Sequence, residues 1–203
     1  MFRRVCAVAG AATLSLSAFV ALATPAAAAQ HIYTSCSTLS DPPNPDVKAD
    51  LSPPIGFTTQ NSNITLEGTP TLSGCSGADF TGSATLSASN VHTFKPGDCS
   101  TFAQGSPGKI IALGNFTATW SSGPPSSGAL KAKGNNDGNP THVVVVLKIT
   151  SGQFLSPDST NPTKIKSSGL NFLPSPGHGD CQTTPIDQVS VTNSSPFVMA
   201  RKL

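Results

Sequence analysis

Hydrophobic and polar residues alternate along most of the chain after residue 30, and no stretch shows a convincing helical period. The segments "NITLEGTPTL" and "GSATLSAS" both follow a two-residue period. Such a period places alternate side chains on opposite sides of a β-strand. In "KIIALGNFTATW" the predicted apolar face consists of Ile110, Ala112, Phe116, Ala118 and Trp120. The pattern therefore predicts a succession of short β-strands.

Turn-forming residues separate these segments. The cluster "GNNDGNP" lies between "SGALKAK" and "THVVVVLKIT", and it predicts a hairpin in which Asp137 and Gly138 supply positive φ angles. "THVVVVLKIT" is apolar on both faces over its centre, which indicates a central strand, and "QVSVT" and "PFVMARKL" predict closing strands. We therefore expect an all-β, single-domain fold, either an antiparallel β-sandwich or a barrel-like sheet, held by two disulfides.

Two segments lack the alternating pattern. "DPPNPDVKADLSPP", residues 41–54, is rich in proline, and we expect it to cross the surface as an extended connection. Residues 154–181 predict a long irregular loop with one short strand at most. Loops of this length are either functional or mobile, and a disulfide at Cys181 would anchor this one.

The first 29 residues have the features of a secretory signal peptide. Arg3 and Arg4 precede an apolar run over residues 5–23, and a Pro- and Ala-rich exit ends at Ala29. This order predicts export and cleavage after Ala29, with a retained membrane anchor as the alternative. No second long apolar run follows, so the mature domain, residues 30–203, is predicted to have no membrane span.

Four cysteines remain after the predicted cleavage, namely Cys36, Cys75, Cys99 and Cys181. An even number of cysteines in an exported chain predicts two disulfides. Three pairings are possible, and we favour a local Cys75–Cys99 bridge with Cys36–Cys181 joining the two ends. The spacing of the cysteines and histidines does not match a zinc site, so no metal is predicted.

The charge of the chain adds one point, about its partners. Charged residues make up 11% of the chain, and the formal net charge of +2 includes the two arginines of the predicted signal peptide. The mature domain is therefore close to neutral. It has no run of basic residues, which disfavours nucleic acid and anionic membranes as partners.

Groups that could act in catalysis are scarce. Glu67 is the only glutamate, and neither the G-x-S-x-G nor the H-E-x-x-H pattern occurs. "GHGDC" is the most suggestive stretch, because His178 and Asp180 could bind a metal or form an acid–base pair. A solvated turn explains the same residues, and we favour it. We therefore expect no cofactor and no catalytic residues, with an extracellular hydrolase that uses residues 177–181 as the alternative.

Trp120 is the single tryptophan and precedes a loop rich in Ser, Gly and Pro. An exposed indole there would suit a carbohydrate-binding module. Carbohydrate-binding surfaces usually need several exposed aromatic residues, and the chain has only one Tyr besides this Trp. Because Trp120 shares its strand face with other apolar residues, we favour a core position and keep the ligand platform as the alternative.

Three short motifs carry a resemblance to a known group of proteins. "LSGCSG" (residues 72–77), "GDCS" (residues 97–100) and "FTATWSSGPPSSG" (residues 116–128) resemble the pattern of small secreted actinobacterial β-rich proteins. The resemblance covers residues 66–128 and implies a β-rich fold and export, with no assigned activity. Together these features predict a secreted, non-catalytic protein, extracellular or associated with the cell wall. Its candidate partners are a cell-wall glycan or another extracellular protein.

Overall fold

The computed structural model describes residues 30–99, 108–137, 139, 141–167, 169–193 and 196–202. The predicted signal peptide and Gly138 of the predicted hairpin turn lie outside these residues. The strands of the described residues pair only in the antiparallel sense, which confirms the all-β prediction. They are β1 (Gln30–Cys36), β2 (Thr38–Ser40), β3 (Val47–Ile55), β4 (Asn63–Leu66), β5 (Thr71–Cys75), β6 (Gly82–Thr93), β7 (Ile110–Trp120), β8 (Ser126–Gly134), β9 (His142–Gly152), β10 (Lys164–Ser167), β11 (Leu170–Pro174), β12 (Ile186–Asn193) and β13 (Phe197–Lys202).

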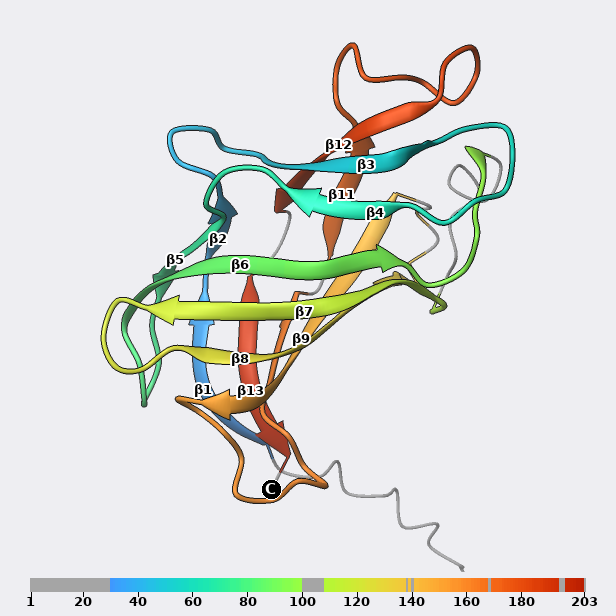
Figure 1. The fold of residues 1–203 in the computed structure, drawn as a ribbon. Helices are drawn as coiled ribbons and strands as arrows, with labels where there is room; N and C mark the ends of the chain where they lie inside the picture. The colour runs from blue at the N-terminus through green and yellow to red at the C-terminus, as the bar shows by residue number, and fades with distance from the viewer. Residues whose placement is uncertain are drawn as a thin grey trace, which may run out of the picture.

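Eight of these strands close into a barrel, the second of the two predicted architectures. The order around it is β3–β4–β6–β7–β8–β9–β11–β12, and β12 pairs with β3 to complete the circuit. Strands β6, β7 and β8 lie side by side along one wall, β4 lies next to β6, and β3 and β12 follow beyond β4 (Figure 1). Closure leaves the barrel strands without free edges, which removes a common route to aggregation.

The remaining strands extend the barrel wall at one end. Strand β9 pairs with β11 near Val143 and with β10 near Leu147, and β6 pairs with β4 near Val91 and with β5 near Ala84. Along one edge, each of the long strands β6 and β9 therefore pairs first with one strand and then with another. The outer strands continue as β10–β13–β1 and as β5–β2. Strand β9, which pairs with three strands, is the central strand that its apolar sequence predicted.

The prediction for residues 41–54 is wrong over most of its length, because residues 47–55 form strand β3 of the barrel. Prolines are tolerated there because of where they lie. Pro53 and Pro54 follow the four residues that pair with β4, and they lie where the register with β12 shifts between Ile186 and Gln188. A strand residue without an N–H is accommodated at such an irregularity.

The single long loop predicted for residues 154–181 is also wrong, because it contains β10 and β11. In β10 the alternation is only four residues long, with Ile165 and Ser167 buried and Lys164 and Lys166 exposed. Gly and Pro residues on both sides hide so short a signal. Strand β11 is one of the eight that close the barrel.

A β-bulge changes the predicted face of β7 at its first residues. The register between β7 and β8 shifts between Ile110 and Ala112. As a result Ile111, rather than the predicted Ile110, lines the interior together with Ala112. A bulge inserts one residue and so breaks strict alternation. The two-residue period therefore placed Ile110 on the inner face in place of Ile111.

All four predicted cysteines form disulfides, but the favoured pairing is wrong. The bonds are Cys36–Cys75 and Cys99–Cys181. The first joins β1 to β5, which lie antiparallel where Ser35 and Ser76 form a bridge. The second joins the loop after β6 to the loop before β12. The topology of the sheet decides this pairing, and distance along the sequence does not.

Candidate functional site

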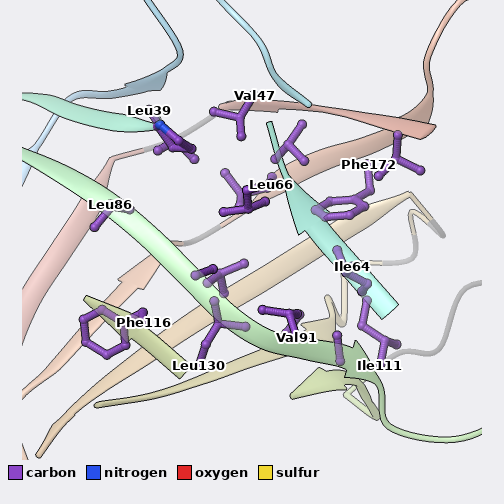
Figure 2. Close-up of a pocket in the computed structure, with 18 of the residues that line it drawn as sticks. Leu39, Val47, Ile64, Leu66, Leu86, Val91, Ile111, Phe116, Leu130 and Phe172 are labelled. Carbon is purple, nitrogen blue, oxygen red and sulfur yellow. The ribbon is translucent and has the colours of Figure 1, made fainter. Parts of the chain in front are cut away.

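The barrel contains an apolar cavity of about 160 Å³ that is partly open to the outside. Every barrel strand contributes to its wall, and Figure 2 shows side chains from opposite strands pointing into the common space. Residues from neighbouring outer strands, Leu39 and Phe197, close part of it. The side chains that define the cavity in the figure are Val47, Ile64, Leu66, Leu86, Val91, Ile111, Phe116, Leu130 and Phe172.

Small side chains on one wall leave the space open. Ala112 and Ala132 are directly paired across β7 and β8, and Ala88 lies on the neighbouring strand β6. An eight-stranded barrel has an interior just wide enough for side chains to fill or for one small ligand. Three alanines at positions where larger side chains would fit therefore favour a barrel that holds one small ligand.

The lining is almost entirely hydrocarbon. Among the described residues that line it there is no charged side chain, and the polar ones are Ser87 and Thr93. The Thr93 hydroxyl accepts a hydrogen bond from the backbone N–H of Ser62 at 3.0 Å. A water molecule needs two to four polar partners, so an apolar cavity of this kind stays dry and accepts apolar molecules.

Three loops meet at the end of the barrel where β3 and β6 end and β12 begins. The backbone of Gln60 pairs with that of Gly97, and the Cys99 N–H donates to the Gly56 carbonyl at 2.8 Å. The Cys99–Cys181 disulfide ties the third loop to these two. This end of the barrel is therefore fixed by covalent and backbone bonds.

Trp120 lies in the core at the other end of β7, as favoured from the sequence, and is 5% exposed. Its ring makes edge-on contacts with Phe80 and Phe154, with ring centroids 5.0 and 5.1 Å away. The indole N–H donates to the Ser126 hydroxyl at 3.0 Å. Because the indole is buried and its N–H is bonded inside the protein, it does not present a platform to a sugar.

His178 and Asp180 are not brought together as a pair. His178 Nδ1 lies 3.0 Å from a carboxylate oxygen of Asp187, a residue that the sequence analysis did not single out. Asp180 instead accepts backbone hydrogen bonds from Gln182 and Thr183, each at 2.8 Å, and from Thr184 at 3.1 Å. Its arrangement is that of a carboxylate that closes a turn, the interpretation favoured from the sequence.

These backbone N–H donors, those of Thr183 and Thr184 first, hold the pKa of Asp180 well below its ordinary value of 3.8. A lowered pKa in the folded state contributes stability above about pH 4 that is lost as the pH falls further. We expect Asp180→Asn to lower the melting temperature near neutral pH and to reduce its decline between about pH 4 and pH 2. Melting curves of both proteins across that range test this, and two parallel pH profiles would contradict it.

Two further histidines each lie beside one aspartate. His31 lies 2.7 Å from Asp79, and His142 is hydrogen-bonded to Asp137 in the turn between β8 and β9. The His142 contact is the main reason why the pKa of Asp137 is lowered. Within the described residues, no group of three or more His, Cys, Asp or Glu side chains is placed to hold a metal ion.

Comparison of the chain with protein families, curated proteins and solved structures finds no match in any of the three. The described part of the chain contains no helix long and apolar enough to cross a membrane. The cavity is therefore the feature of the structure on which a function can be argued.

Proposed function

We propose that the protein is an exported, non-catalytic binding protein that holds a small, uncharged, apolar molecule inside its barrel. The observation that carries this proposal is the cavity of about 160 Å³ with its hydrocarbon lining. Burial of apolar ligand surface supplies the driving force, at roughly 25 cal/mol per Å² removed from water.

The size and chemistry of the cavity narrow the ligand class. An engineered cavity of about 150 Å³ lined by similar side chains accepts benzene, whereas pockets for drug-sized ligands measure about 300–1,000 Å³. A single aromatic ring or a short alkyl chain therefore fits. An ion or a strongly polar group would lose its hydration without gaining a partner.

Export is part of the same proposal. It is supported by the order of basic, apolar and small residues in the first 29 positions and by two disulfides, which are compatible with an extracellular location. Contact with the cell envelope and kinship with small secreted actinobacterial proteins also belong to the proposal. In this view the barrel carries its ligand outside the cell.

Binding is tested with toluene as the probe and phenol as its polar counterpart. We expect toluene to raise the melting temperature and to give a saturable heat in calorimetric titration. Phenol should bind at least tenfold more weakly, because its hydroxyl would find few partners among the lining residues. At 100 times its dissociation constant, a ligand of the native state adds about 2.7 kcal/mol to the free energy of unfolding.

A matched pair of variants locates the site. Ala88→Leu adds three carbons to a residue that lines the cavity, and Ala129→Leu makes the same change at an exposed position of β8. We expect Ala88→Leu to fold and to lose toluene binding while Ala129→Leu retains it. The proposal fails if the wild-type protein does not respond to toluene, or if folded Ala88→Leu binds it unchanged.

A further inference from the structure

Six of the nine lysines lie on the outer face of one part of the sheet. Their placement follows from strand alternation, because the residues between them, such as Ala132, Leu147 and Ile165, point inward and are buried. Strands β8, β9, β10 and β13 are consecutive neighbours, so the six side chains share one surface. This lysine face consists of Lys131, Lys133, Lys148, Lys164, Lys166 and Lys202.

The lysine face has no acidic counterpart within it. The sequences of β7, β8, β9, β10 and β13 contain neither Asp nor Glu. The ion pairs of the described residues all join a histidine to an aspartate, and none involves a lysine. The ammonium groups are therefore available to a partner.

Like charges even stand directly opposite each other on this face. Lys148 of β9 and Lys164 of β10 are cross-strand partners. Directly opposed like charges destabilise a sheet, and an opposite or neutral residue at either position would remove the repulsion. Among the ion pairs of the described residues, none offsets the repulsion between these two lysines.

Three carboxylates lie on the opposite side of the barrel, on or beside β3 and β4. In the closed circuit of eight strands, β3 is the strand farthest from β8, four positions away in either direction. Asp50 lies on β3, and Glu67 follows β4; both accept a hydrogen bond from the side-chain amide of Gln188 on β12. Asp46, just before β3, accepts one from Ser190. These three carboxylates are therefore separated from the lysine face by the barrel.

We propose that the lysine face binds a linear anionic polysaccharide, independently of the ligand in the cavity. Lysines two residues apart on a strand stand about 7 Å from each other, and neighbouring strands about 4.8 Å. Point charges repeated in this way suit carboxylates that recur along one flexible chain. The attraction is mainly electrostatic and falls with salt.

The composition of the face favours this partner over two other polyanions. The side chains between the lysines are small or aliphatic, including Val144, Val146, Val198 and Ala200. A single-stranded nucleic acid is usually held by aromatic side chains that stack on its bases, and an anionic membrane by a helix with inserted aromatic or leucine residues. The lysine face offers neither device.

Binding is tested on the mature chain, residues 30–203, with polygalacturonate as the probe and neutral dextran as the control polymer. We expect saturable binding to polygalacturonate that weakens more than tenfold when sodium chloride rises from about 50 to about 500 mM. Dextran should not bind. The proposal is overturned if polygalacturonate does not bind at low salt.

Two double variants with the same change in charge decide which surface binds. Lys164→Gln with Lys166→Gln removes two charges from the lysine face, and Lys48→Gln with Lys95→Gln removes two exposed charges elsewhere. We expect the first pair to weaken binding at least fivefold and the second less than twofold. Equal losses would overturn the assignment to this face, as would stronger binding to phosphatidylglycerol vesicles or single-stranded DNA than to polygalacturonate.

Lys148→Glu separates a binding role from a structural one. It turns the like pair with Lys164 into an opposite pair, so we expect the melting temperature to be unchanged or higher while polygalacturonate binding falls at least fivefold. Retained binding in this folded variant would contradict the proposal.

Discussion

Replacing Cys99 and Cys181 together by alanine is expected to lower the free energy of unfolding by about 4 kcal/mol. The bond closes a loop of 82 residues. Constraint of the unfolded chain by a loop of that length gives about 4.5 kcal/mol in the chain-entropy model. This is a large part of the total of about 5–15 kcal/mol that is typical of a domain. Urea unfolding followed by the fluorescence of the single tryptophan measures the loss.

The Cys36–Cys75 bond provides the comparison. Its loop of 39 residues gives about 4 kcal/mol by the same relation. Cys36 and Cys75 are each 2% exposed and belong to the core, so their removal also costs packing contacts. Cys181 is only partly buried, so mild reduction should open its bond first. A loss below about 1 kcal/mol for the first double variant, or free thiols in the oxidised protein, would contradict the expected effect.

Alternation of apolar and polar residues predicted β6 and β7, in which a long segment repeats the pattern. Strands β8 and β9 were predicted from the turn cluster between them and from the continuous apolar run of β9. Alternation missed β10 because four residues between turn formers give too few repeats. It missed β3 because Pro53 and Pro54 suggested a connection, although an irregularity in the pairing accommodates them.

The cavity could not be predicted in the same way. The alternating pattern places Ala112 on an apolar face, but it does not show that Ala88 and Ala132 join it or whether larger neighbours fill the space in front of these alanines. That depends on which strands lie opposite, and so on the closure of the barrel. The large residues on the far side, such as Phe172 of β11, come from a segment predicted to be a loop.

Surface chemistry also depends on the sheet. The chain has no basic run, yet lysines from four strands share one face because β8, β9, β10 and β13 are neighbours. His178 and Asp180 show the converse, since closeness in sequence did not pair them. Asp180 accepts hydrogen bonds from backbone N–H groups of its own turn, and His178 lies beside the carboxylate of Asp187 on β12. Spacing along a chain predicts such pairs well only within a regular element.

Trp120→Ala is expected to lower the free energy of unfolding by about 3–5 kcal/mol, the range for removal of a large buried aromatic side chain. The indole is 5% exposed and contacts Phe80 and Phe154. A cavity would remain between these two rings, because strands β6 and β7 hold the surrounding backbone in a closed barrel. Urea unfolding followed by far-ultraviolet circular dichroism measures the loss without needing the tryptophan signal.

Trp120→Phe is the matched control because it keeps a ring between Phe80 and Phe154 and removes the indole N–H. The Ser126 hydroxyl, which accepts that N–H, also donates to the Gln153 carbonyl, so it keeps a partner in the variant. We therefore expect a loss of about 1–2 kcal/mol, from one hydrogen bond and a small volume change. Because the wild-type chain has one tryptophan, its emission reports on this cluster alone and should be blue-shifted, and unaffected by glycans. Red-shifted emission together with a negligible loss in Trp120→Ala would instead place the indole in solvent, where stacking on a sugar becomes the better explanation of this residue.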